Sequence, residues 1–366
     1  MRSSTRGPTP VLELVANYRC AGIMVQNPLT FLGSPGSPYT RKMLAILRYR
    51  RIAYRFVIGS HRSDLGLPRP KVALLPTFYL PNEAGVLEAV VDSTPIVRRL
   101  EKEFEGRKVV PPDPALAFID YLIEDFADEW LTKAMFHYRW HFADDARKAE
   151  DQLPRWSVQP QSDAELAPIQ RMIGERQISR LYVVGSNATT APVIEASYQR
   201  ILLVLKEHLG RHPFLLGARP SSCDFALYGQ LTQLTHFDPT PQAIALKVAP
   251  RVVAWVDILD DLSGLEPDHA DWLSPADLSS SLRPLLDEIG RVYTPVMCAN
   301  AKALSEGRDT VTCEVDGRPW TQAPFAYQGR CLAWLRDEYS RLNPAARSTV
   351  DQALEGTGCH RLFQGL

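Results

Sequence analysis

Strand-like and helix-like segments alternate over the first hundred residues of this 366-residue chain, and that alternation limits the fold more than any other feature. Short apolar runs typical of strands lie at 28–33, 52–58, 72–80 and 86–91. Apolar residues at helical spacing begin at Ser37-Pro38 and again near Thr94-Pro95, where the residue types favour a helix start. This order predicts an α/β domain.

The pattern changes after a short proline-rich linker at 107–114. Beyond it, an apolar stripe recurs every four residues, at Phe118, Leu122, Phe126, Trp130 and Ala134. Two more helices are predicted at 165–182 and 193–209, and Ser221 with Asp224 forms a capping box before an apolar run. The sequence therefore predicts an all-helical domain over residues 115–268.

Residues 269–366 follow this domain as a mostly helical C-terminal extension. We expect a helix at 282–305 that breaks near Thr294-Pro295 and a short hairpin that turns at Asp316-Gly317. Two amphipathic helices are predicted at 325–342 and 347–356. The aromatic content of the extension predicts that it packs on the helical domain.

The balance of charge and the cysteine pattern exclude several classes of protein. The chain has 41 Lys and Arg against 42 Asp and Glu, a net charge of −1, which gives no electrostatic basis for binding nucleic acid or an anionic membrane. No apolar run approaches the ~18 residues that a membrane span needs. The six cysteines form no Cys-x-x-Cys motif, which excludes a zinc ribbon and is typical of reduced thiols in a cytoplasmic protein.

Residues 1–27 form an N-terminal extension that allows two interpretations. The apolar stretch 11–16 faintly resembles a signal peptide, but Glu13 interrupts it and no clean cleavage site follows, so we reject export. Met24 stands just before the first predicted strand. Translation of the native protein starts at Met1 or at Met24, and in the second case residues 1–23 do not belong to it.

Three motifs in the first domain carry a resemblance to a known family. Ser37-Pro38-Tyr39 opens the first predicted helix, Leu75-Pro76 lies in the third strand-like run, and Asp92-Ser93-Thr94 precedes the second helix. In this order they resemble the thioredoxin-like N-terminal domain of the cytosolic glutathione transferase superfamily, closest to its serine-type classes. The resemblance implies a mixed four-stranded sheet over residues 28–106, and residues 115–268 are similar to the family's all-helical C-terminal domain.

The resemblance also implies roles for these residues. Ser37 would donate a hydrogen bond to the glutathione sulfur and so favour the thiolate. The positive end of the helix would favour the thiolate as well. Leu75 and a cis-Pro76 would pair with the cysteinyl backbone of the peptide like an added strand. Asp92 would take the α-ammonium of glutathione and Ser93 its α-carboxylate.

Simpler interpretations stand beside these roles. Ser37 and Thr94 are also good N-caps for the helices that the following prolines open. Ser34 and Thr40 compete with Ser37 for the hydroxyl role. The loop before the proline segment holds four basic candidates for the glycyl carboxylate of glutathione, namely His61, Arg62, Arg69 and Lys71.

The helix at 121–140 is the expected wall of the electrophile site, because in the resembling family the first helix of this domain faces the thiol. Trp130 and Tyr138 are the candidates for contact with an apolar ligand. The alternative is that both are plain core residues.

The same helix carries carboxylates and histidines spaced by four residues: Glu124 and Asp128, Asp125 and Glu129, His137 and His141. We expect a solvated acidic face and ordinary histidines, and no metal site.

We therefore expect a cytoplasmic transferase that takes glutathione as co-substrate and presents its thiol to a small hydrophobic electrophile, as in detoxification. Ser37 in place of a cysteine disfavours thiol–disulfide exchange, since no mixed disulfide can form there. Two alternatives stay open: a non-catalytic binding or scaffold protein with this fold, and a glutathione-dependent isomerase. The resemblance allows a homodimer. The extension could close over the electrophile site, cover a dimerisation surface or bind a partner.

Overall fold

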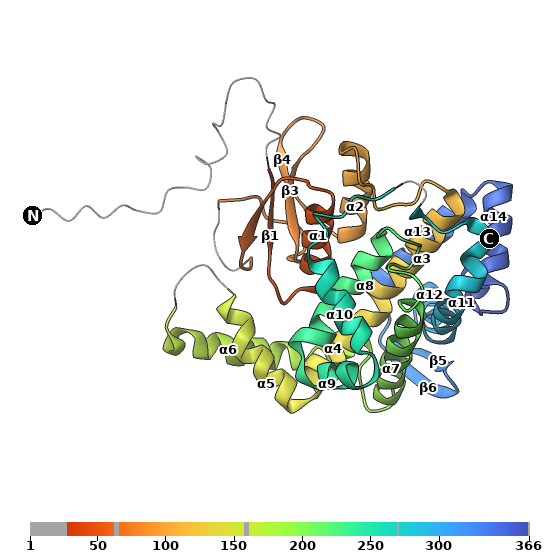
Figure 1. Cartoon of the computed structure of the whole chain (residues 1–366). Coiled ribbons are helices and arrows are strands. Elements are labelled where there is room, and N and C mark those ends of the chain that lie inside the picture. Colours follow the sequence, from red (N-terminus) through yellow and green to blue (C-terminus); the bar gives the residue numbers. More distant parts are fainter. Residues whose placement is uncertain (1–27, 62–65, 157–160, 269–270, 365–366) are drawn as a thin grey trace, which may run out of the picture.

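A computed structural model describes residues 28–61, 66–156, 161–268 and 271–364 (Figure 1). The two interpretations of the N-terminal extension fall on residues 1–27 and lie outside this part of the chain. In the described part, no helix has both the length and the apolar character to cross a membrane.

The first domain is a sheet of four strands with two helices. The strands are β1 (Leu29–Gly33), β2 (Tyr54–Ile58), β3 (Thr77–Pro81) and β4 (Leu87–Val91), in the spatial order β2-β1-β3-β4. β1 and β2 run parallel, whereas β1–β3 and β3–β4 are antiparallel, so the sheet is mixed as expected. The predicted strand at 72–80 begins only at Thr77, directly after Pro76, because a proline has no N–H to give to the ladder.

Helices α1 (Pro38–Tyr49) and α2 (Ser93–Glu103) pack against each other beside this sheet (Figure 1). The Phe31 ring on the central strand β1 stacks on Phe78 of β3 with ring centroids 4.7 Å apart, and on Phe56 of β2 at 5.0 Å. Most of α1 is buried, because α1 also packs against α8 (Ser222–Thr232) of the helical domain. The start of α1 is therefore held from two sides.

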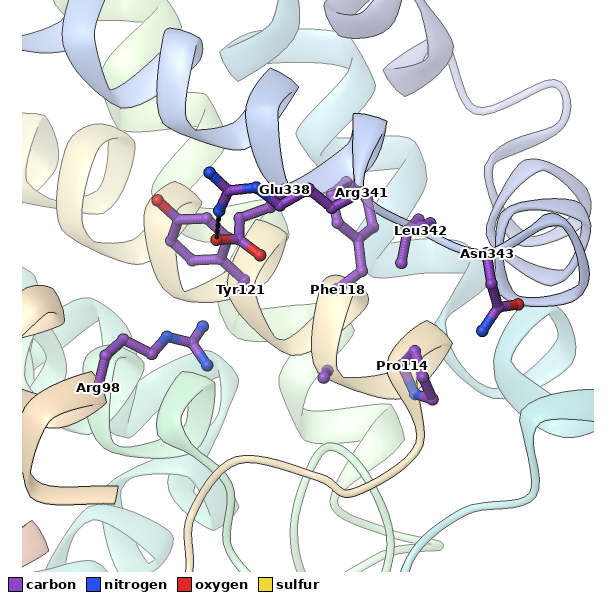
Figure 2. Close-up of a pocket in the computed structure, with 9 residues that line it drawn as sticks. Arg98, Pro114, Phe118, Tyr121, Glu338, Arg341, Leu342 and Asn343 are labelled. Atoms are coloured by element: carbon purple, nitrogen blue, oxygen red, sulfur yellow. Dashed lines mark hydrogen bonds and ion pairs between the residues drawn. The ribbon is translucent and has the colours of Figure 1, made fainter. Parts of the chain in front are cut away.

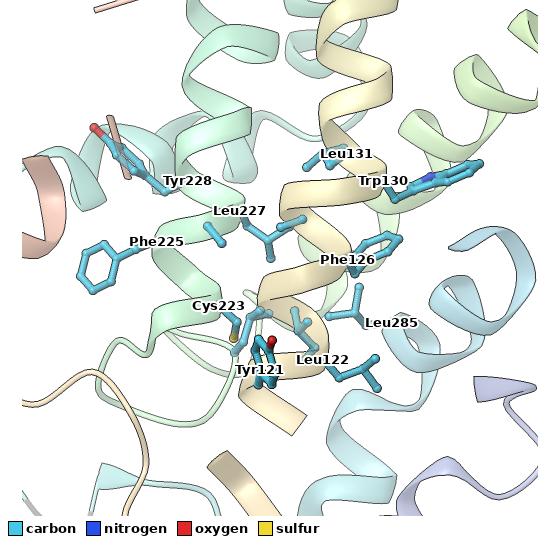
Figure 3. Close-up of a cluster of buried hydrophobic side chains, with 14 of the residues drawn as sticks. Tyr121, Leu122, Phe126, Trp130, Leu131, Cys223, Phe225, Leu227, Tyr228 and Leu285 are labelled. Atoms are coloured by element: carbon cyan, nitrogen blue, oxygen red, sulfur yellow. The ribbon is translucent and has the colours of Figure 1, made fainter. Parts of the chain in front are cut away.

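The helical domain is built around α3 (Pro114–Phe126) and α8, which lie side by side in Figure 3 with apolar side chains between them. α3 continues through a wider turn at Ala127–Leu131 into α4 (Thr132–His141). The remaining helices are α5 (Ala143–Gln152), α6 (Asp163–Ile178), α7 (Ala191–His208), α9 (Pro239–Val248) and α10 (Pro250–Asp260). The capping box is confirmed: Ser221 N and Oγ both donate to Asp224 Oδ2, at 2.9 and 2.8 Å.

The extension comprises α11 (Leu278–Glu288), α12 (Thr294–Ser305), α13 (Ala326–Ser340) and α14 (Pro344–Leu354), with a hairpin of β5 (Val311–Val315) and β6 (Arg318–Gln322) between α12 and α13. The hairpin turn is at Asp316-Gly317, as predicted, and both residues have positive φ. The regular helix is interrupted directly before Thr294-Pro295, near the predicted break. The interruption is a wider turn at Ile289–Tyr293 that joins α11 to α12, and Pro295 lies in the first turn of α12.

The extension packs on the helical domain, with α13 and α14 against α3 and α11 against α7 (Figure 1). One hydrophobic core runs from Phe31 in β1 to Phe363 near the C-terminal end. The extension therefore shares its core with the rest of the molecule.

Candidate functional site

Ser37 is the N-cap of α1. Its backbone is extended, with φ −95° and ψ 120°, and its Oγ accepts a hydrogen bond of 3.2 Å from Thr40 N. The same hydroxyl donates to the carbonyl oxygen of Leu75 at 3.1 Å. Ser37 is thus a helix cap, as the simpler interpretation holds, and it also joins the start of α1 to the segment before β3.

The loop before Ser37 is fixed by side chains of the helical domain. Arg139 Nη1 donates to Gly36 O at 2.9 Å, and Gln233 Nε2 donates to Pro35 O at 3.2 Å. A side chain at Gly36 would collide with Leu153 and with Trp156, so a glycine is needed at this close approach. These contacts hold the Ser37 hydroxyl in place relative to both domains.

The two competing hydroxyls differ from Ser37 in their surroundings. Thr40 is fully buried, and its Oγ1 accepts from Ser34 N at 3.4 Å. Ser34 and Ser37 are half-buried. Tyr39 OH donates to the Asp128 carbonyl at 2.8 Å, so this phenol is turned to the helical domain.

The bond between Leu75 and Pro76 is cis, as the resemblance implied. Leu75 is half-buried, Pro76 is buried, and β3 begins at the next residue. Among the basic candidates of the preceding loop, His61 contacts this segment, with Nε2 3.1 Å from Leu74 O and 2.9 Å from Thr77 Oγ1. Arg62 lies outside the described residues.

Asp92 and Ser93 stand at the start of α2. Asp92 has a φ of 83°, a sparsely populated conformation for a non-glycine residue, and its side chain makes no cap hydrogen bond. Its Oδ2 accepts a hydrogen bond of 2.6 Å from the phenol of Tyr327, at the start of α13. Burial raises the pKa of Asp92, and the Tyr327 hydrogen bond and the charge of Lys42 oppose this shift. Ser93 is buried as the first residue of α2.

Thr94 does not cap α2, and that alternative interpretation is wrong. Its hydroxyl instead donates to Glu124 Oε1 at 2.9 Å, across the domain boundary. The backbone explains the difference, because Asp92 occupies the N-cap position and α2 already includes Ser93. Thr94 therefore connects the start of α2 to the carboxylates of α3.

Those carboxylates are buried, and the prediction of a solvated acidic face is wrong. The ammonium of Lys42 on α1 lies 2.7 Å from Glu124 Oε1 and 2.6 Å from Asp128 Oδ2, and all three residues are buried. This cation lies 82 residues before Glu124 in the chain, and spacing along one helix could not reveal it. Asp125 and Glu129 are also buried, where Tyr293 OH donates to Asp125 and Gln328 Nε2 donates to the carbonyl of Glu129.

Burial dominates the electrostatics of this cluster. It raises the pKa of Asp125 to about 7 and that of Asp128 to about 6, and raises the pKa of Glu129 as well. The pKa of Glu124 is lowered because the charges of Lys42 and Arg98 outweigh its burial. In the described parts of the chain, His, Cys, Asp and Glu side chains form no group of three or more that could hold a metal ion.

Of the two histidines of α4, His137 lies beside polar partners. His137 is buried, with Nδ1 2.8 Å from Ser186 Oγ and Nε2 3.3 Å from Glu195 Oε1. Its ring stacks on His141 with centroids 4.6 Å apart. Burial lowers the pKa of His137 to about 4, so its imidazole is neutral near pH 7.

Trp130 and Tyr138 lie in the core. Trp130 is 2% exposed, and its Nε1 donates to Ser197 Oγ at 2.8 Å. Tyr138 is 1% exposed and meets Tyr198 edge to face at 5.2 Å. Figure 3 shows Trp130 directed away from the helix that carries Phe225 and Tyr228. The structure does not bring these two side chains to the Ser37 hydroxyl, and their burial is that of plain core residues.

Sequence reasoning missed Tyr327 and Lys42. Tyr327 lies 235 residues after Asp92, and only the aromatic content of the extension pointed to it. For Lys42 a weak signal exists, because carboxylates at four-residue spacing in an otherwise apolar helix require a cation from elsewhere if that helix is buried. The lysine lies among the apolar residues of α1, on a helix that the pattern already predicted to be packed.

Two family models match the chain. One, described as the N-terminal domain of glutathione S-transferase, matches residues 31–108, and one described as the C-terminal domain matches residues 169–257. No curated protein matches the chain. The two matches lie in the α/β domain and in the helical domain, and the extension is outside both.

Several solved structures are similar to the chain at low scores. A glutathione S-transferase from Methylobacterium radiotolerans, in complex with glutathione sulfonate, is 19% identical over 67% of this chain and 94% of its own, with a TM-score of 0.39. A Tau class glutathione S-transferase from mango is 16% identical over 66% and 94%, with a TM-score of 0.40. A maleylacetoacetate isomerase from Anaeromyxobacter dehalogenans is 16% identical over 66% and 94%, with a TM-score of 0.36.

Proposed function

Because this chain belongs to the glutathione S-transferase superfamily, we propose that it binds glutathione at the start of α1 and activates the thiol for attack on a small hydrophobic electrophile. The observation that carries this proposal is the 3.1 Å hydrogen bond from Ser37 Oγ to Leu75 O. It brings together a hydroxyl, a helix N-terminus and the cis-proline segment. These are the three groups that a glutathione thiol site of the serine type requires.

The chemistry starts from the thiol. A free thiol has a pKa of about 8.5, so little thiolate is present at neutral pH. The positive end of α1 favours the anion, and the Ser37 hydroxyl can turn from the Leu75 carbonyl to donate to the sulfur. The thiolate then forms a carbon–sulfur bond with the electrophile, and the leaving group departs with the electron pair of the bond that breaks.

The rest of the peptide would be held by the neighbouring groups. The backbone of Leu75, next to cis-Pro76, offers a carbonyl and an N–H to the cysteinyl residue. The Asp92 carboxylate is available to the α-ammonium, and the start of α2 at Ser93 favours the α-carboxylate. Detoxification, a cytoplasmic location and a homodimer remain predictions that go with this proposal.

Turnover of glutathione with 1-chloro-2,4-dinitrobenzene tests the catalytic role of Ser37. Ser37→Gly removes the hydroxyl, while glycine at an N-cap costs only a few tenths of a kcal/mol in stability. We expect kcat to fall about 100-fold while the Kd for glutathione changes little. Unchanged turnover would contradict the role of Ser37, and Ser34→Gly serves as the matched control in the same loop.

A second candidate function follows from the contact between Tyr327 and Asp92. Since the phenol already occupies one oxygen of this carboxylate, the fold could serve a binding protein that does not turn glutathione over. Such a protein would bind glutathione or another ligand and show no product with any electrophile. A glutathione-dependent isomerase would convert its substrate without consuming glutathione.

A further inference from the structure

A pocket of about 300 Å³ lies where the extension meets the rest of the molecule (Figure 2). It is bounded by α2, by the first half of α3, and by the end of α13 with the loop that leads to α14. Its volume is at the lower end of the range for small-molecule sites. The lining residues are Arg98, Pro114, Ala117, Phe118, Tyr121, Glu338, Arg341, Leu342 and Asn343.

The apolar part of the lining is rigid. Phe118 packs against Tyr339 and Phe363 with ring centroids 5.6 and 5.5 Å apart, and those two rings stack at 4.4 Å. Tyr121, three residues further along α3, is buried except for the part that faces the pocket. Such aromatic edges suit a flat apolar body.

The two arginines of the pocket differ in their ion pairs. Arg341 binds Glu338 at 3.2 Å and Asp337 at 2.6 Å, so its single positive charge is already taken up by two carboxylates. Figure 2 shows the Glu338–Arg341 contact as a dashed line, with Arg98 on a different helix. Of the two arginines that line the pocket, Arg98 is therefore the one not bound by Asp337 and Glu338.

Arg98 lies at the outer limit of ion-pair distance from one buried carboxylate, and its charge also opposes the raised pKa of buried Asp120. Within the described chain, the carboxylate at ion-pair distance from it is Glu124, whose Oε2 lies 3.9 Å from Arg98 Nη2. Glu124 is already bound by Lys42 at 2.7 Å. The Arg98 guanidinium lies over the Tyr121 ring, 5.1 Å from its centroid, and its side chain is 32% exposed. This geometry presents a planar cation beside an aromatic surface at the pocket.

We propose that this pocket binds a small aromatic carboxylate, with the carboxylate on Arg98 and the ring against Tyr121 and Leu342. The guanidinium fork matches a carboxylate in geometry as well as in charge. Because one wall belongs to α13, the bound acid would also hold the extension against α2. The proposal goes beyond glutathione chemistry and does not depend on it.

Calorimetric titration of the full chain with 1-naphthoate tests the proposal, with 1-naphthamide as the neutral analogue. We expect saturable binding of one naphthoate per chain, and binding of the amide weaker by about tenfold or more because it lacks the charge. Arg98→Gln should weaken naphthoate binding by a similar factor. The matched control is Arg99→Gln, since Arg99 binds Glu103 and the Pro81 carbonyl instead of lining the pocket.

A second pair of variants tests the location without changing charge. Ala117→Trp fills the pocket and should abolish naphthoate binding, whereas Ala333→Trp, at an exposed position of α13, should leave it unchanged. The proposal is overturned if naphthoate does not saturate, if the amide binds equally well, or if binding survives in both Arg98→Gln and Ala117→Trp. A separate titration with glutathione tests the proposed function, so a failure of naphthoate binding can be distinguished from a failure of glutathione binding.

Discussion

The phenol of Tyr327 donates a 2.6 Å hydrogen bond to Asp92 Oδ2, joining the first turn of α13 to the start of α2. The extension thereby reaches the carboxylate to which we assign the α-ammonium of glutathione. Because Asp92 is partly desolvated and its backbone has a positive φ, its orientation depends on such contacts. The extension is therefore a part of the proposed site.

Removal of the phenol should strengthen glutathione binding. Tyr327→Phe keeps the ring and leaves the Asp92 carboxylate without its hydrogen-bond donor, so the ligand ammonium no longer has to compete for it. We expect the Kd from calorimetry to fall by about fivefold, the equivalent of one hydrogen bond. Tyr339→Phe, on the same helix but bonded to Asp351, should have no effect. Weaker binding in Tyr327→Phe would show that the phenol completes the site instead of competing for it.

The buried pair of Lys42 with Glu124 and Asp128 should be costly to break. Lys42→Met removes the ammonium that binds Glu124 of α3 and Asp128 of the wider turn after it, and such a loss costs about 3–5 kcal/mol. We expect the urea midpoint of unfolding to fall strongly. Lys102→Met, at an exposed position of α2, should leave the midpoint within error. A midpoint unchanged by Lys42→Met would contradict the burial of this pair.

Asp125 should make stability depend on pH. Burial raises its pKa in the folded state to about 7 from a reference value of 3.8, so between these values the folded carboxyl keeps a proton that the unfolded chain has lost. The stabilisation is complete below the lower value and is lost as the pH rises through about 7. The neighbouring charges of Asp128 and Glu124 raise this pKa further, whereas the hydrogen bond from Tyr293 and the charge of Lys42 oppose the shift.

Melting temperatures between pH 5 and pH 8 measure this effect. The wild-type value should fall as the pH rises, and Asp125→Asn should flatten the slope because the amide cannot ionise yet can still accept from Tyr293. Asp144→Asn, with a side chain 82% exposed on α5, is the matched control. Equal slopes in wild type and Asp125→Asn would rule out the raised pKa.

Gly229 sets the distance between α1 and α8 and therefore the position of Ser37. A Cβ at this residue would lie 2.5 Å from the Pro38 carbonyl, directly after Ser37. Gly229→Ala should displace the start of α1, lowering both the melting temperature and the turnover of glutathione. Gly264→Ala adds a methyl with no atom within 4 Å and should change neither. Full activity in Gly229→Ala would show that Ser37 need not be held in this position.

Local signals predicted much of this fold. The Ser221–Asp224 capping box, the hairpin turn at Asp316-Gly317 and the Ser37 cap depend on residues a few positions apart, so their sequence patterns are sufficient. The cis bond before Pro76 came from the resemblance to a family, since a proline in a strand-like run permits several structures.

The contacts that could not be predicted join distant parts of the chain. Lys42 meets Glu124 and Tyr327 meets Asp92 only after folding has brought three segments together. Carboxylates at four-residue spacing along a helix predict a solvent-exposed face, and only the position of Lys42 in the fold shows that these are buried. The surroundings of Trp130 and Tyr138 could not be predicted either, because an aromatic stripe on a helix occurs both in the wall of a ligand site and in a hydrophobic core.

Calorimetric titration of the purified chain with glutathione near neutral pH tests the central claim most directly, with Asp92→Asn beside the wild type. We predict saturable binding of one glutathione per chain, with a Kd of about micromolar to low millimolar, and affinity weaker by about tenfold in the variant. Absence of binding in the wild type, confirmed by an unchanged melting temperature at saturating glutathione, would contradict it. In that case the Ser37 hydroxyl is a helix cap alone.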